Sequence, residues 1–243
     1  WMIRGEVLHR DSLGSEQIIR PGQVNLMTAG RGIAHSEESQ TTHVHAAQLW
    51  IALPDSHRHI TPRFQHYPDL PGAQIGDYQA TVLAGESLGL TAPAEVHSPL
   101  MAVDLHASSN TGTARASFPL RTDFEHAVMS LSGHVTVEGQ HLPEQELFYL
   151  PAGIESVELE CAPDSRLLII GGEPMDEAIL LWWNFVARTT EDMQQARAQW
   201  EAEAITDAAT VDGAPRRFGP PVASPLKPLH APSLEGMALR ASK

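Results

Sequence analysis

Six of the chain's 13 histidines fall between residues 35 and 66, and the first of them stands two positions before a carboxylate, in His35-Ser36-Glu37. Residues two apart in a β-strand point to the same side, so the His35 imidazole and the Glu37 carboxylate can converge on one ion. A nitrogen–oxygen pair suits Fe(II), Mn(II), Ni(II) or Zn(II), and the lack of thiolates argues against a closed structural zinc site. The same pattern also fits an ordinary polar strand face.

The other histidine pairs have less favourable surroundings. His43 and His45 share the two-residue spacing but follow a polar Gln-Thr-Thr stretch that predicts a loop, so we expect both to be solvated. His57 and His59 lie between prolines, and the same interpretation applies to them. The sequence contains no nucleophile elbow, no Gly-rich phosphate loop and no cysteine-based triad.

Short strands separated by turns must position these side chains. Residues 1–53 read as several such strands, among them 2–9 and 45–53, and residues 78–170 read as a second β set after a connection rich in Pro and His. Residues 3–7 and 23–30 resemble residues 131–135 and 146–153 in their order of strand, Gly turn and Pro turn. This similarity favours two copies of one β unit, and an all-β fold class.

A single helix is predicted over residues 190–204. Thr189 and Thr190 offer a hydroxyl cap, and acidic residues in the first turn suit the positive end of the helix dipole. Apolar residues, Trp200 among them, then recur at spacings of three and four. The Pro- and Ala-rich tail after Thr206 has no periodicity, and we expect it to wrap one barrel with Phe218 as its apolar anchor.

Composition narrows the function classes. The 243 residues carry 16 Lys and Arg against 30 Asp and Glu, a net charge of −14, which argues against a nucleic-acid partner. No apolar run is long enough to span a bilayer, so no membrane partner is expected. The single Cys161 fits a reducing compartment and a cytoplasmic location. The chain opens at Trp1 as if inside a strand, which we interpret as an N-terminal truncation.

Three stretches together resemble the pirin family of two-cupin proteins. The first, within residues 21–37, contains Met-Thr-Ala-Gly-Arg-Gly-Ile-Ala-His-Ser-Glu, and the second, residues 48–54, reads Gln-Leu-Trp-Ile-Ala-Leu-Pro. The third begins with Gly-Glu-Pro at residues 172–174 and continues with Trp-Trp-Asn-Phe-Val-Ala-Arg at residues 182–188. Their order and spacing agree with the family over nearly the whole chain.

The resemblance implies two jelly-roll cupin β-barrels that face each other, followed by a short helix and a tail. We place the N-terminal barrel at residues 1–75, without its first strands, and the C-terminal barrel with helix and tail at residues 76–243. The resemblance also implies one Fe(II) in the N-terminal barrel, bound by three His and one Glu. The last two ligands match His35 and Glu37, and the first two would fall about eight and ten residues before Trp1.

The second barrel offers no equivalent site when the two units are aligned. Pro119 and Arg121 then stand where the first barrel would carry its two histidines, and Glu158 and Glu160 stand opposite His35 and Glu37. A guanidinium and two carboxylates without an imidazole make a poor Fe(II) site. We therefore interpret Arg121, Glu158 and Glu160 as structural polar residues on a barrel wall.

Three functions of different classes remain open. The resemblance implies quercetin 2,3-dioxygenase activity on a small aromatic flavonol, with Glu37 accepting the proton of the 3-hydroxyl group and Met27 or Trp50 in an apolar lining. The alternative is an iron-dependent regulatory module that binds a protein partner, as a transcription cofactor or a modulator of a metabolic enzyme. The third is a cupin scaffold without activity.

With two of four ligands, the given chain is expected to bind Fe(II) weakly, to be inactive on quercetin and to be less stable than a longer form. His43 and His45 have the spacing to replace the missing pair. Their predicted loop would then have to fold into the barrel mouth, which we do not expect.

Overall fold

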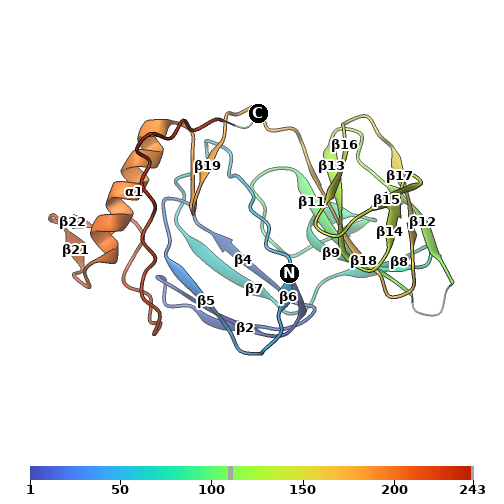
Figure 1. Cartoon of the computed structure of the whole chain (residues 1–243), viewed down its shortest axis with the longest axis horizontal. Coiled ribbons are helices and arrows are strands. Elements are labelled where there is room, and N and C mark those ends of the chain that lie inside the picture. Colours follow the sequence, from blue (N-terminus) through green and yellow to red (C-terminus); the bar gives the residue numbers. More distant parts are fainter. Residues whose placement is uncertain (109–111, 242–243) are drawn as a thin grey trace. The chain divides into compact units, whose positions relative to one another are not determined.

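The computed structural model describes residues 1–108 and 112–241, which form two compact units (Figure 1). The first unit combines residues 1–66 with residues 175–243, and the second is the continuous segment Tyr67–Pro174. The division differs from the sequence-based domains, because the helix and the tail group with the N-terminal strands. The physical link is visible at Ala34, which packs against the apolar cluster of the C-terminal segment and donates its N–H to the Phe218 carbonyl.

The first unit contains short strands in several small sheets. Its strands and helix are β1 (Met2–Arg4), β2 (Val7–Asp11), β3 (Glu16–Ile19), β4 (Val24–Thr28), β5 (His35–Ser39), β6 (His45–Ala46), β7 (Arg63–Tyr67), β19 (Leu180–Trp182), β20 (Phe185–Ala187), α1 (Thr190–Ala204), β21 (Thr210–Val211) and β22 (Ala214–Pro215). The order β3-β2-β5 forms the largest of these sheets, and β4 pairs with β7.

The second unit consists of two larger sheets. Its strands are β8 (Gly72–Ile75), β9 (Tyr78–Ser87), β10 (Leu90–Thr91), β11 (Leu100–Ala107), β12 (Ala114–Pro119), β13 (Glu125–Ser132), β14 (Val135–Val137), β15 (Gln140–Leu142), β16 (Leu147–Leu150), β17 (Ser156–Cys161) and β18 (Arg166–Gly172). In one sheet the strand order is β10-β9-β11-β18-β13-β16, and β8 also pairs with β9. In the other sheet the order is β12-β17-β14-β15.

Strict alternation along the strands produces the core of the second unit. In β12 and β17 every second side chain is buried, so that Phe118, Val157 and Leu159 enter one continuous apolar cluster while their neighbours stay exposed. Tyr78 is fully buried in this cluster, and its hydroxyl donates to the Ala114 carbonyl at 3.1 Å. The period of two that the sequence shows is therefore the period of a half-buried strand.

Helix α1 begins and ends where the sequence predicts. Thr189 is its N-cap, and the hydroxyl accepts the Asp192 N–H at 3.0 Å. Met193 and Ala196 are buried, and Trp200 packs edge-on against Phe218 with 5.4 Å between the ring centroids. Phe218 is itself buried, so the tail has the apolar anchor expected of it. In Figure 1 the red C-terminal segment runs beside the helix.

Two strand predictions were wrong in extent. Residues 2–9 are divided at Gly5, whose φ of +85° suits glycine and where an added Cβ would lie 2.3 Å from the His43 carbonyl oxygen. In residues 45–53 only His45 and Ala46 form a strand, opposite β1. No helix among the described residues is long and apolar enough to cross a membrane.

Candidate metal centre

The segment before β5 is fixed from two sides. Arg31 donates its N–H to the Ile60 carbonyl at 3.0 Å, and Ala34 donates to the Phe218 carbonyl at 3.1 Å. Between them, Gly32 has a φ of +147°, and a Cβ there would lie 2.9 Å from the Arg217 carbonyl oxygen. The glycine is needed because the tail approaches the backbone closely. These contacts determine where β5, and with it His35, begins.

Pairing with β2 then places four polar residues on one side of the sheet. In the antiparallel register Asp11 lies opposite His35, and His9 lies opposite Glu37. Directly opposed residues share a face, and so do residues two apart on one strand. The structure therefore brings His35 and Glu37 to the same face, as their spacing predicts. Arg10 belongs to the other face, where it contacts Glu38 at 2.7 Å.

The two predicted ligands keep exposed surface. The protein around His35 nevertheless desolvates its imidazole and thereby lowers its pKa, an effect that Glu37 opposes and that His9 reinforces. A histidine with a lowered pKa is neutral at physiological pH, and only the neutral ring offers a lone pair to a metal ion.

The sequence analysis missed His9 and Asp11, which are 2% and 3% exposed. His9 Nε2 lies 3.2 Å from Asp11 Oδ2, and the His9 ring stacks on Phe64 and on His35. Burial acts to raise the pKa of Asp11, but hydrogen bonds from the Ser15 backbone, His9 and the Leu13 backbone outweigh it and lower the pKa. The available signal was the spacing: His-x-Asp on β2 repeats the His-x-Glu of β5.

The donor chemistry fits a divalent metal ion, because a neutral imidazole nitrogen and a carboxylate oxygen lie on one strand face. Residues 1–108 and 112–241 gather no group of three or more His, Cys, Asp or Glu side chains that could hold a metal ion. Of this chain, the residues that would hold the ion are His35 and Glu37.

The corresponding positions of the second unit point away from its core. Glu158 and Glu160 occupy the exposed positions of β17, and Glu160 forms an ion pair with Arg115 at 3.1 Å. Pro119 is exposed, and Arg121 is paired with Asp123 at the surface. Glu158, Glu160 and Arg121 are thus polar side chains at the surface of the second unit.

The remaining candidates have varied surroundings. Met27 is partly buried on β4, whereas Trp50 is half exposed outside any strand. His66 on β7 contacts Asn25 Oδ1 on β4 through its Nδ1 at 2.7 Å, and burial, followed by the charge of Arg20, lowers its pKa. His57 Nδ1 contacts the Ser56 hydroxyl at 2.8 Å.

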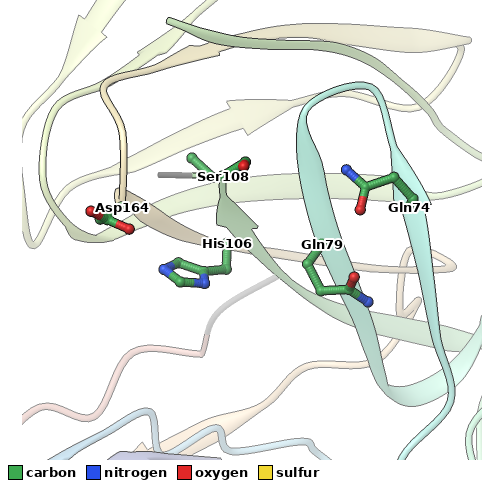
Figure 2. Close-up of a pocket in the computed structure, with 6 residues that line it drawn as sticks. Gln74, Gln79, His106, Ser108 and Asp164 are labelled. Atoms are coloured by element: carbon green, nitrogen blue, oxygen red, sulfur yellow. The ribbon is translucent and has the colours of Figure 1, made fainter. Parts of the chain in front are cut away.

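A separate pocket of about 300 Å³ lies in the second unit. Figure 2 shows Gln74 and Gln79 on neighbouring strands at one side of it, Asp164 at the other, and His106 and Ser108 between them; Ala107 completes the lining. The lining is polar, and none of the residues predicted from the sequence takes part in it.

Comparison with known proteins gives two family matches. Residues 1–51 match the Pirin family, and residues 103–206 match the Pirin C-terminal cupin domain. A Pseudomonas aeruginosa protein named "Putative quercetin 2,3-dioxygenase PA1205" is 45% identical over 226 residues, which are 91% of this chain and 70% of that protein. A pirin-like protein of Caulobacter vibrioides is 34% identical, over 83% of this chain and 71% of its own length.

The structural comparison agrees. The crystal structure of a quercetin 2,3-dioxygenase from Acinetobacter baumannii superposes with a TM-score of 0.89 at 45% identity, over 100% of this chain and 77% of that one. The mostly-β, two-cupin architecture expected from the sequence is thereby confirmed. A structural match covers the whole of this chain, and several relatives are more than 30% identical to it. The chain therefore belongs to the pirin family.

Proposed function

We propose that this protein is a metal-dependent dioxygenase of the quercetin 2,3-dioxygenase type, with a single Fe(II) held in the N-terminal cupin by His35 and Glu37. The observation that carries the proposal is the arrangement of these two donors on one face of β5, in a chain 45% identical to proteins named for that activity. The second cupin offers only exposed carboxylates at the aligned positions.

Each residue has a separate task in the proposed reaction. When bound, the iron supplies a Lewis acid and a redox centre for dioxygen chemistry. His35 contributes a neutral nitrogen donor and holds its ring against His9. Glu37 accepts the proton of the flavonol 3-hydroxyl group as general base, which makes the substrate an electron-rich anion. The partly buried Met27 contributes apolar surface for the aromatic substrate.

The family pattern assigns four ligands, and this chain provides two. The resemblance assigns the other two to a His-x-His pair at positions that would precede Trp1. With His35 and Glu37 alone, we expect weak Fe(II) binding, and we expect full activity to need the additional pair. A recombinant chain extended upstream of Trp1 by the His-x-His pair tests this directly, since it should bind one iron tightly.

The central experiment measures iron stoichiometry, quercetin consumption and carbon monoxide release on the given and the extended chains. His35→Ala should abolish iron binding, including the residual binding of the short chain. Glu160→Gln is the matched control on the second cupin and should change nothing. Equal losses from the two substitutions would refute the assignment, and so would near-stoichiometric iron in the short chain that disappears with His43→Ala and His45→Ala.

The same experiment separates the two function classes. An extended chain that binds one iron but neither consumes quercetin nor releases carbon monoxide would contradict the dioxygenase. The iron-dependent protein-binding module would then be favoured, and a pull-down comparing Fe(II)- and Fe(III)-loaded protein would test it.

A further inference from the structure

Three stacked rings from three strands lie beside the candidate metal centre. The His9 ring of β2 packs against Phe64 of β7 with 4.2 Å between centroids and 9° between planes. It also stacks with His35 of β5, at 5.7 Å and 19°. The exposed His35 imidazole therefore rests on a buried ring that is itself supported by an aromatic side chain.

A buried carboxylate fixes the central ring of this stack. Asp11 Oδ1 accepts the Leu13 N–H at 2.9 Å and the Ser15 N–H at 3.0 Å, so the turn after β2 holds the carboxylate in place. Its other oxygen, Oδ2, lies 3.2 Å from His9 Nε2. Because an ionised carboxylate only accepts hydrogen bonds, Nε2 of His9 carries the proton. The His9 ring is thus fixed in its plane by Asp11 and against its face by Phe64.

The Nε2 atom of His9 and the carboxylate of Asp11 are already engaged and are not offered to a metal ion. Nε2 of His9 is engaged by Asp11, and the carboxylate of Asp11 is engaged by His9 and two backbone N–H groups. Both residues are almost fully buried, whereas His35 and Glu37 keep exposed surface. Any effect of the pair on a bound ion therefore passes through the His35 ring.

We propose that Asp11 and His9 are positioning residues that fix the orientation of the His35 imidazole, and so prepare it as a ligand. The inference rests on the proposed metal centre for its function. Outer residues that orient metal-binding histidines change metal affinity about tenfold to a hundredfold when they are replaced. The pair provides such support through ring stacking, with the carboxylate anchoring the buried ring rather than the ligand itself.

The test uses three variants on the full chain with Co²⁺ as the probe. His9→Ala removes the stack and the anchor, and should weaken Co²⁺ binding about tenfold to a hundredfold. His9→Phe keeps the stack and should recover part of this loss of affinity. The Co²⁺ affinity of Asp11→Asn should lie between those of His9→Phe and the wild type, and its visible Co²⁺ spectrum should change. Arg10→Gln, on the opposite face of β2, is the control and should retain wild-type affinity and spectrum.

A second measurement needs no metal. The ring nitrogen and carbon NMR signals of His35 should be single and sharp in the metal-free wild type, and should broaden or double in His9→Ala. Single sharp His35 signals in a folded His9→Ala would overturn the inference, as would a Co²⁺ affinity of His9→Ala equal to that of the wild type. If a wild-type chain extended by the upstream His-x-His pair binds no Co²⁺, the proposed metal centre fails, and the NMR comparison still decides the positioning role. Circular dichroism verifies folding, and His9→Phe serves if His9→Ala does not fold.

Discussion

His9 and His126 are both 2% exposed, one in each unit, but their ring nitrogens have different surroundings. His9 is paired with Asp11, whereas neither nitrogen of His126 meets a hydrogen-bonding protein group in the part of the chain that the structure describes. His126 lies on the inner face of β13, against Gly171, where an added Cβ would be 2.4 Å from its Cδ2. Burial lowers the pKa of His126, and Asp123 only partly opposes this.

Replacing His126 should therefore stabilise the second unit and change its pH dependence. Removal of a buried polar group without a protein partner is expected to add about 1–3 kcal/mol at pH 7.5 with His126→Leu. Because the folded-state pKa lies below the unfolded value, the wild type loses stability as the pH falls below the unfolded pKa of about 6.5. The variant should lose less between pH 7.5 and 5.5.

Urea unfolding at both pH values, followed by hydrogen–deuterium exchange of peptides from residues 125–132, measures both effects. His106→Gln replaces an exposed histidine of the same unit and should behave as the wild type. A His126→Leu variant that is less stable than the wild type at pH 7.5 would contradict this account of the buried ring.

At the scale of elements, the last turn of α1 contacts the tail through the carboxylates of Glu201 and Glu203, of which Glu201 accepts the Ala231 N–H at 2.6 Å. Glu203 is 4% exposed and accepts the backbone N–H groups of Arg217 and Phe218, the latter at 3.0 Å. An acidic residue near a helix C-terminus is normally unfavourable. Here the two N–H groups offset the unfavourable interaction of the Glu203 carboxylate with the helix dipole. They also hold Phe218 in the aromatic cluster, where the Phe218 carbonyl accepts the Ala34 N–H.

Loss of this carboxylate should release the tail. Glu203→Ala leaves two backbone N–H groups without their acceptor, at a cost of about 1–3 kcal/mol, and Phe218→Ala should cost about 3–5 kcal/mol. Both variants should be cut by trypsin after Arg216 or Arg217 faster than the wild type, as mass spectrometry of timed digests would show. Glu191→Gln, in the exposed first turn of α1, is the control. Unchanged cleavage in Glu203→Ala would mean that other contacts hold the tail.

The elements that the sequence predicts well are those whose signals are local. The boundaries of α1 follow from its cap and periodicity, and the shared face of His35 and Glu37 follows from strand geometry alone. The His-x-Asp spacing puts His9 and Asp11 on one face of a strand, but their position opposite Glu37 and His35 depends on the register between β2 and β5, which has no local signal. The strand predicted over residues 45–53 failed for a related reason: apart from His45 and Ala46, no ladder partner among the described residues extends it.

At the scale of the whole molecule, the chain divides into one continuous and one discontinuous unit. Residues 67–174 contain a complete apolar cluster and two paired sheets. The first unit needs residues from both ends of the described chain, because its aromatic cluster combines Ala34 with Phe185 and Phe218. The sequence-based division groups the helix and tail with the C-terminal cupin, and the match to the Pirin C-terminal cupin domain also extends through α1, to residue 206.

The continuous unit should therefore fold by itself. A polypeptide of residues 67–174 is expected to show β-type circular dichroism, dispersed NMR signals and one cooperative thermal transition. Phe118→Ala provides the internal test, since loss of a fully buried aromatic side chain should cost about 3–5 kcal/mol and lower the transition temperature. A polypeptide without a cooperative transition would show that the unit depends on the rest of the chain.

The discontinuous unit also determines the order in which the protein is completed during synthesis. Residues 1–66 leave the ribosome before residues 67–243, but Phe218, the aromatic ring that closes their unit, is translated some 150 residues later. At about 5–20 residues per second, this is a delay of roughly 8 to 30 seconds. The second cupin emerges whole within that interval and can fold before the first. The first unit is thus completed after the second, and a chain released before Phe218 leaves His35 on an unfinished domain.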